Sequence, residues 1–177
     1  MDAEASSVLE LDEGRGDIIF RLARGKRGGS VQTRRLERGE GIAGSVIESG
    51  QPMIVGDVQR EECFSDRFDK ETGFKTRSLI CVPLVIREKT IGALQVINKK
   101  SGMRFTGVDL EILTGLARQI AVAIDNARLY QRLEENFKLT AEELKVTQQK
   151  LIRSERSAAL ANLVQGVAMR SETQSCP

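Results

Sequence analysis

The chain has 177 residues, with 27 Lys and Arg against 25 Asp and Glu, 40% hydrophobic residues and no histidine. This length provides for one domain and an extension, and the near-balance of charge excludes the strongly basic surface that nucleic-acid binding needs. No apolar run approaches the roughly 20 residues of a membrane span, and the N-terminus is too polar for a secretory signal, so we expect a cytoplasmic protein without a membrane segment.

The composition also restricts the chemistry. The absence of histidine removes the commonest metal ligand, the usual general base and a phospho-accepting imidazole. The three cysteines, Cys63, Cys81 and Cys176, are widely spaced, which indicates reduced thiols rather than a disulfide framework. We therefore predict no metal site, and the sequence points to no certain cofactor.

Residues 6–11 and 17–24 are rich in apolar side chains and flank a polar, Gly-containing segment, which predicts two strands joined by a turn. The basic, Gly-rich residues 25–38 predict a surface loop that is either solvated or in contact with phosphate. In residues 39–50 three apolar side chains share one helical face and Gly50 supplies a stop, which predicts a short helix.

Residues 53–55 predict a short strand. Residues 57–73 are polar with isolated phenylalanines and predict a loop with about one helical turn, which either folds over a pocket or only connects its neighbours. Residues 77–98 predict the clearest strand pair, with Pro83 at a bulge or a sheet edge because proline lacks a backbone donor. Five strands with helices between them predict an α+β fold with an antiparallel sheet.

A long helix is predicted to begin at Thr106, whose side chain can cap the free amides while Asp109 reaches back. No proline interrupts it before Pro177. Its first part carries an apolar stripe at three- and four-residue spacing that should pack on the sheet: Leu110, Leu113, Leu116, Ala117, Ile120 and Ile124.

Beyond residue 126 the apolar pattern becomes heptad-like and predicts a parallel, two-stranded coiled coil. One column contains Tyr130, Phe137, Leu144, Leu151 and Ala158, and the other contains Leu133, Thr140, Thr147, Ser154 and Ala161. The second column is mostly small or polar, which weakens the dimer seam. Such a seam belongs either to a helix that shifts between packings or to a marginal coiled coil held at its ends.

Residues 39–130 resemble a GAF domain, the small-molecule sensory module of bacterial signalling proteins. The resemblance is carried by GEGIAGSVIESGQPMIVGDV, RSLICVPLVIREKTIGALQVINKK and FTGVDLEILTGLARQIAVAIDNARLY, and residues 7–12 fit the first strand of the family. It implies an antiparallel sheet of about five to six strands flanked by helices. The usual helix before the first strand is lacking, so we expect the long helix to expose an apolar flank that a partner chain covers.

Residues 149–168, QKLIRSERSAALANLVQGVA, resemble the start of a sensor histidine kinase dimerisation helix. Met169 stands where that family has its phosphorylated histidine, so we expect no kinase activity in this chain. The predicted organisation is a GAF-like domain (1–128), a coiled-coil signalling helix (129–150), a partial dimerisation helix (151–170) and a polar tail (171–177). The resemblances imply a regulatory domain of a bacterial sensor histidine kinase that acts as a homodimer.

Four residues resemble part of a signature of cyclic-nucleotide-binding GAF domains: Asn98, Lys99, Phe105 and Asp109. In that group the Lys and Asp form an ion pair beside the pocket, so their role is mainly structural. The match is partial, because Leu110 replaces the final Glu and Ala23-Arg24 replaces a Phe-Asp pair that positions the base. The resemblance therefore favours another small ligand over a cyclic nucleotide.

A ligand pocket is expected between the sheet and residues 57–73. The candidate contact residues are Ser7, Phe64, Phe74, Arg77 and Ser78. Arg77 would pair either with an anionic group of the ligand or with the acidic loop.

Two other functions remain open. The domain can be a ligand-free dimerisation module, or it can reduce free methionine sulfoxide, as some GAF domains do, through Cys63 and Cys81. The second function requires the two thiols to approach closely, whereas Cys81 lies in an apolar strand where it should be buried and unreactive. Bilin and haem sites are not expected, because their histidine is absent.

Overall fold

The computed structural model describes residues 2–12, 14–25, 29 and 34–172, with side chains described as far as residue 157. The chain divides into two units, Met1–Asn126 and Ala127–Pro177. Within the described part, no helix combines the length and apolarity needed to cross a bilayer.

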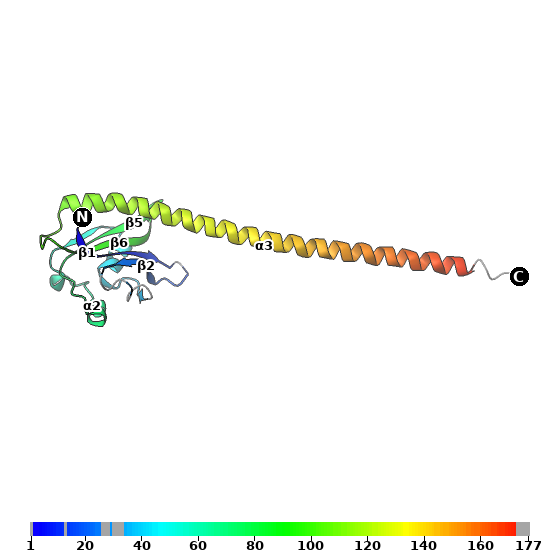
Figure 1. Ribbon diagram of the computed structural model, residues 1–177, viewed down its shortest axis with the longest axis horizontal. Coiled ribbons are helices and arrows are strands. Elements are labelled where there is room, and N and C mark those ends of the chain that lie inside the picture. The colour runs from blue at the N-terminus through cyan, green and yellow to red at the C-terminus, as the bar shows by residue number, and fades with distance from the viewer. Residues whose placement is uncertain (1, 13, 26–28, 30–33, 173–177) are drawn as a thin grey trace. The chain divides into compact units, whose positions relative to one another are not determined.

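The first unit is built on a six-stranded antiparallel sheet, in the order β3-β2-β1-β6-β5-β4 (Figure 1). Its strands are β1 (Ala3–Leu11), β2 (Ile18–Arg24), β3 (Arg35–Leu36), β4 (Met53–Val55), β5 (Leu79–Ile86) and β6 (Lys89–Lys99). The predicted α+β class with a GAF-like antiparallel sheet of about five to six strands is therefore confirmed.

The sequence predicts five strands, and the additional strand in the structure is β3. It lies in the basic segment that the sequence predicts as a loop. It forms because Leu36 pairs with Ile18 and is buried among the apolar side chains. One leucine in a polar segment gives too weak a pattern for a strand prediction. Residues 26–28 and 30–33 of this segment lie outside the described residues.

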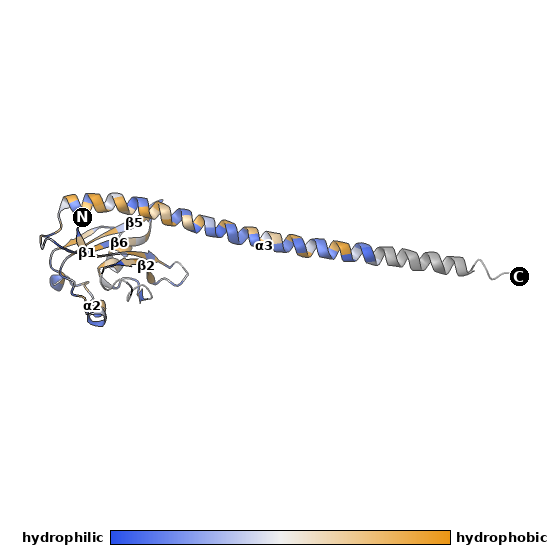
Figure 2. Cartoon of the chain, in the orientation of Figure 1, coloured by the Kyte–Doolittle hydropathy of each residue, from blue (hydrophilic) through white to orange (hydrophobic). Residues whose placement is uncertain are grey.

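Each face of the sheet packs against a helix, so the central strands are buried on both sides. On one face Leu9 and Cys81 join the core formed with α1 (Gly41–Ser49). On the other face Val8 and Ile80 pack with α3 (Gly107–Glu172). Successive strand residues point to opposite faces, which explains why β5 is an almost unbroken apolar run. Figure 2 shows orange and blue bands alternating along the first turns of α3.

Helix α1 ends as predicted, with Gly50 in the left-handed conformation (φ 66°) and its N–H donating to the Val46 carbonyl. The polar segment that follows contains two short helices, η2 (Val58–Arg60) and α2 (Arg67–Thr72). Residues 57–73 therefore hold slightly more helix than the single turn predicted.

Pro83 lies in β5 beyond the reach of β4, which pairs only with residues 79–81. A register shift follows immediately, between Leu84 and Val85. In the described sheet, Pro83 therefore lies beside a bulge and on a part of β5 that has only β6 as a neighbour, as the sequence predicts.

Helix α3 begins with the predicted capping box. The Thr106 N–H donates to Asp109 Oδ2 (2.8 Å), and the Asp109 N–H donates to Thr106 Oγ1 (3.4 Å). The stripe that packs on the sheet consists of Leu110, Leu113, Ala117, Ile120, Ala121 and Ile124. Leu116, which the sequence pattern assigned to this stripe, is instead 47% exposed, because Leu113 and Ala117 define a face that turns away from it.

In the second unit the helix continues to Glu172. The predicted seam residues Tyr130, Leu133, Phe137, Leu144 and Leu151 are between 57% and 77% exposed in the single chain. The parallel coiled coil that would cover them stays a prediction. Its last two positions, Ala158 and Ala161, lie outside the described side chains.

Two glycines provide a matched test of the packing. A Cβ on Gly92 would lie 2.1 Å from the Leu9 carbonyl oxygen, whereas a Cβ on Gly115 would meet no atom within 4 Å. We expect Gly92→Ala to separate β1 from β6 and lower the free energy of unfolding by about 2 kcal/mol or more. Gly115→Ala should raise it by about 0.5–1 kcal/mol, because alanine favours the helix. Urea unfolding measures both, and equal effects would contradict this packing.

Candidate functional site

A cavity of about 130 Å³ lies between the sheet and the segments that contain α1 and α2. Its walls are mainly apolar and include four aromatic rings. The residues that border it from the sheet include Ser7, Leu9, Phe20, Leu79, Gln95 and Ile97, and those from the helical segments include Ile42, Phe64, Phe68, Asp69, Thr72 and Phe74. The cavity therefore lies between the sheet and residues 57–73.

Helix α2 forms one wall of this cavity and is fastened on both sides. On the inside, Phe68 meets Phe20 edge to face, with ring centroids 5.5 Å apart and planes at 67°. Such aromatic pairs contribute about 0.5–1.5 kcal/mol beyond the area that they bury. The inner contact is therefore specific in geometry and moderate in strength.

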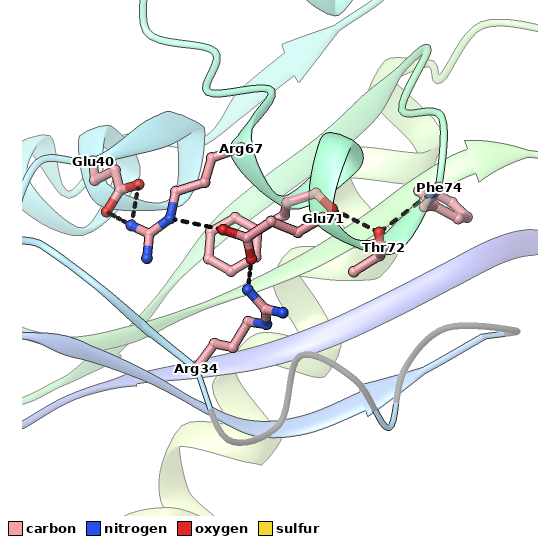
Figure 3. A network of polar contacts seen from close by, with 7 residues as sticks. Arg34, Glu40, Arg67, Glu71, Thr72 and Phe74 are labelled. Carbon is pink, nitrogen blue, oxygen red and sulfur yellow. Dashed lines mark hydrogen bonds and ion pairs between the residues drawn. The ribbon is translucent and has the colours of Figure 1, made fainter.

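On the outside, α2 carries an ion-pair network that spans three segments (Figure 3). Arg67 contacts Glu40, at the start of α1 (3.2 Å), and Glu71, one turn along α2 (3.4 Å). Glu71 also pairs with Arg34, which precedes β3. Because these side chains are partly exposed, each pair contributes no more than about 1 kcal/mol. The network orients α2 without locking it.

The C-terminal end of α2 is joined to the chain that leads into β5. The backbone N–H and the hydroxyl of Thr76 both donate to the Asp69 carboxylate, at 2.6 and 2.7 Å. The Thr72 hydroxyl donates to the Phe68 carbonyl and accepts from the Phe74 N–H, a contact that Figure 3 shows. A displacement of α2 would therefore pull on residues 74–76.

One polar pair lies on the sheet side of the cavity. The Gln95 side-chain amide on β6 donates to Ser7 Oγ on β1, with 2.7 Å between nitrogen and oxygen. Ser7 is only 5% exposed. Both residues border the cavity, so the pair presents polar atoms to a mainly apolar surface.

Comparison with known proteins identifies the architecture. The family model described as "GAF domain" matches residues 1–124, which is more than half of the chain.

The chain belongs to the GAF domain family.

Three relatives illustrate the match. The dual 3',5'-cyclic-AMP and -GMP phosphodiesterase 11 of Drosophila melanogaster is 34% identical over 105 residues, covering 59% of this chain and 7% of that protein. Dual phosphodiesterase 11A of Takifugu rubripes is 33% identical over 137 residues, covering 76% and 15%. The GAF domain of a Coxiella burnetii phosphoenolpyruvate-protein phosphotransferase superposes with a TM-score of 0.64 at 24% identity, covering 71% and 74%. The chain spans less than a quarter of the curated relatives it matches.

The GAF signature residue Asn98 lies at the centre of a buried hydrogen-bond cluster. Its side-chain oxygen accepts from the backbone N–H groups of Arg77 (2.8 Å) and Ser78 (3.2 Å). Its side-chain nitrogen donates to the Lys75 carbonyl and to the Glu4 carboxylate, both at 2.8 Å. Asn98 is 1% exposed and adopts φ 54°, a conformation that asparagine tolerates better than most residues.

The next signature residues form the expected ion pair. Lys99 Nζ lies 2.8 Å from Asp109 Oδ2 and 5.9 Å from the centre of the Phe105 ring. The hydrogen bond from Lys99, and then that from the Thr106 N–H, holds the pKa of the Asp109 carboxyl below its ordinary value of 3.8. The pair fastens the end of β6 to the first turn of α3.

The five residues that the sequence predicts as ligand contacts fall into two groups. Ser7, Phe64 and Phe74 border the cavity, whereas Arg77 and Ser78 do not. Arg77 instead pairs with Glu4, and the backbone N–H groups of Arg77 and Ser78 donate to Asn98.

Sequence reasoning missed Phe20, Asp69 and Gln95, which also border the cavity. Gln95 carried a usable signal, because it is the one amide in the otherwise apolar run of β6 before Asn98.

The two described cysteines differ in their surroundings. Cys81 is fully buried in β5, and this burial raises the pKa of its thiol. The thiolate that disulfide exchange needs is therefore disfavoured there. Cys63 is half-buried in the segment between η2 and α2. Within the described residues, no cluster of three or more potential ligands could hold a metal ion.

The Lys99–Asp109 pair predicts a specific acid dependence. Because the folded pKa of Asp109 lies below its unfolded value near 3.8, its contribution to stability is complete above about pH 5 and is lost as the pH falls through the lowered pKa. We expect Asp109→Asn to reduce the free energy of unfolding at pH 7 and to flatten its decline in acid. Glu111→Gln, an exposed carboxylate change on the same turn, should leave the decline unchanged. Urea unfolding from pH 2 to 7 measures both, and identical profiles for the two variants would contradict the role of the pair.

Proposed function

We propose that this chain is the regulatory GAF domain of a signalling protein, that it holds a small molecule in the cavity between the sheet and α2, and that it relays the ligand's presence through a dimeric C-terminal helix. The observation that carries the proposal is the cavity of about 130 Å³ with four aromatic rings in its walls. A ligand-free module would be expected to fill this space with side chains, because close packing stabilises a core.

The connection from the cavity to α3 supports a relay. Asp69 in the cavity wall holds Thr76, and the two residues after Thr76 are held by Asn98. Lys99 follows Asn98 and pairs with Asp109 in the first turn of α3. A ligand that shifts α2 would therefore act on the start of the helix through contiguous hydrogen bonds.

The apolar face of the second unit supports a parallel homodimer. Exposed Tyr130, Leu133, Phe137, Leu144 and Leu151 follow one another at spacings of three, four, seven and seven residues, as in a heptad pattern, and a second copy of the same helix would bury them. In the first unit, Val108, Ile112 and Leu116 on the outer face of α3 are also at least 47% exposed, which agrees with an apolar flank that a partner covers.

The parent protein is proposed to be a cytoplasmic bacterial sensor histidine kinase. This rests on residues 149–168, which resemble a kinase dimerisation helix and follow the part matched by the family model. Met169 cannot accept a phosphoryl group on nitrogen, so we assign no kinase reaction to this chain.

A cyclic nucleotide is the second candidate ligand. It is favoured by the Asn98, Lys99, Phe105 and Asp109 signature and by the names of the phosphodiesterase relatives. The absence of an aromatic residue at Ala23 removes a stacking contact of roughly 1–3 kcal/mol. Methionine sulfoxide reduction is less favoured, because burial keeps the Cys81 thiol protonated.

A cavity-filling variant tests ligand binding. Ala23 borders the cavity, so Ala23→Met should fill it and abolish binding of any compound that stabilises the wild type. Calorimetry with cAMP, cGMP and small aromatic and carboxylate compounds measures binding, and a ligand at 100 times its Kd should stabilise the wild type by about 2.7 kcal/mol. Ala141→Met, on the exposed helix of the second unit, is the control. Equal binding to the wild type and Ala23→Met would place the ligand elsewhere.

A second pair of variants tests the dimer. Leu144→Glu with Leu151→Glu places charge in the proposed seam and should raise the dimer dissociation constant more than 100-fold, since burying each leucine contributes about 2 kcal/mol. Leu139→Glu with Val146→Glu changes two apolar residues outside the columns, 60% and 48% exposed, and should have little effect. Sedimentation equilibrium distinguishes the outcomes, and a wild-type monomer at all concentrations would exclude the dimer.

A further inference from the structure

Among the described residues, the cavity is bordered by one cation, Arg24, and by one acidic side chain. The only acidic side chain that borders the cavity there is Asp69, whose carboxylate holds Thr76. Arg67 lies over the Phe68 ring but is paired with Glu40 and Glu71, and it does not border the cavity. A buried anion without a cation is strongly destabilised.

Arg24, the last residue of β2, is the one described cation that borders the cavity. Its neighbour Ala23 packs against the core on the cavity side of the sheet. Because successive strand side chains point to opposite faces, we expect the side chain of Arg24 to leave β2 on the face opposite to that of Ala23. Arg24 is exposed, so water already solvates its charge.

The Ser7–Gln95 pair defines what the cavity can recognise instead. The Ser7 hydroxyl accepts from the Gln95 amide, which leaves the hydroxyl proton of Ser7 free to donate and Gln95 Oε1 free to accept. A donor and an acceptor thus lie side by side on a mainly apolar surface of the cavity.

The cavity volume limits the body of the ligand. An engineered apolar cavity of about 150 Å³ binds one benzene molecule, and this one measures about 130 Å³. One six-membered ring fits. A ribose and a cyclic phosphate in addition would require α2 to move outward.

From these observations we infer that the cavity selects a neutral, single-ring ligand in which a carbonyl acceptor and an N–H donor are adjacent, as in a lactam. The ligand carbonyl accepts from Ser7 Oγ–H, its N–H donates to Gln95 Oε1, and its ring packs among Phe20, Phe64 and Phe68. This assignment rests on the proposed function, because it specifies the ligand class of the same cavity.

Two isomers test the assignment directly. In 2-pyridone the N–H and C=O are adjacent, whereas in 4-pyridone they lie at opposite ends of the same ring. NMR titration of the full chain should show 2-pyridone binding at least about fivefold more tightly than 4-pyridone, since one net hydrogen bond is worth about 1 kcal/mol. Benzoate, an anion with the same ring size, should bind more weakly still. Equal affinities for the isomers, or tighter binding of benzoate or cGMP than of 2-pyridone, would overturn the inference.

Variants identify the atoms. Ser7→Ala and Gln95→Leu should each weaken 2-pyridone about fivefold and leave benzene binding unchanged, whereas Arg24→Gln should alter neither. If benzoate binds and Arg24→Gln abolishes that binding, the cavity uses a cation and the inference is wrong. The wild-type isomer comparison does not depend on how the variants fold.

The same binding measurements test the ligand class and the presence of a ligand site separately. If any probe binds and Ala23→Met blocks it, the cavity is a ligand site even when the isomers bind equally. If benzene, both pyridones, benzoate, cAMP and cGMP all fail to bind, both proposals fall.

Discussion

The buried side-chain amide of Asn98 accepts two hydrogen bonds and donates two, and these four bonds fix the ends of β1, β5 and β6 relative to one another. Since Asn98 has φ 54°, the chain turns at this residue and delivers Lys99 to Asp109 at the start of α3. The cavity wall depends on the same cluster, because the segment that Asn98 holds also carries Thr76, the partner of Asp69. Loss of this one amide would loosen both the cavity wall and the helix start.

Sequence patterns predict the elements whose signals are local. The β5–β6 pair, the Gly50 stop of α1 and the Thr106–Asp109 box each follow from residues close in the chain, so each could be predicted. Elements that depend on distant contacts could not. The strand β3 exists because Leu36 reaches a core built by other strands, and the exposure of Leu116 is decided by where the sheet lies.

The candidate site shows the same division. Ser7 and Phe64 could be placed at the cavity because they lie on elements whose positions a GAF-like fold dictates. Arg77 was a reasonable partner for an anion by residue type, but its guanidinium is taken by Glu4, 73 residues away in the chain. Gln95 acquires its significance only when β6 lies beside β1 and its amide meets Ser7. Pairings of this kind come from the strand register, which single-residue patterns do not specify.

The ion pairs on the outer face of α2 have a kinetic consequence. They join Arg67 to Glu40 and Glu71, and Glu71 to Arg34, and none of these side chains borders the cavity. They therefore act on α2 without contacting the proposed ligand. Salt screens exposed charges, so higher ionic strength should speed the opening of α2 when such a ligand enters or leaves. The rate of ligand exchange would then depend on side chains that lie outside the cavity.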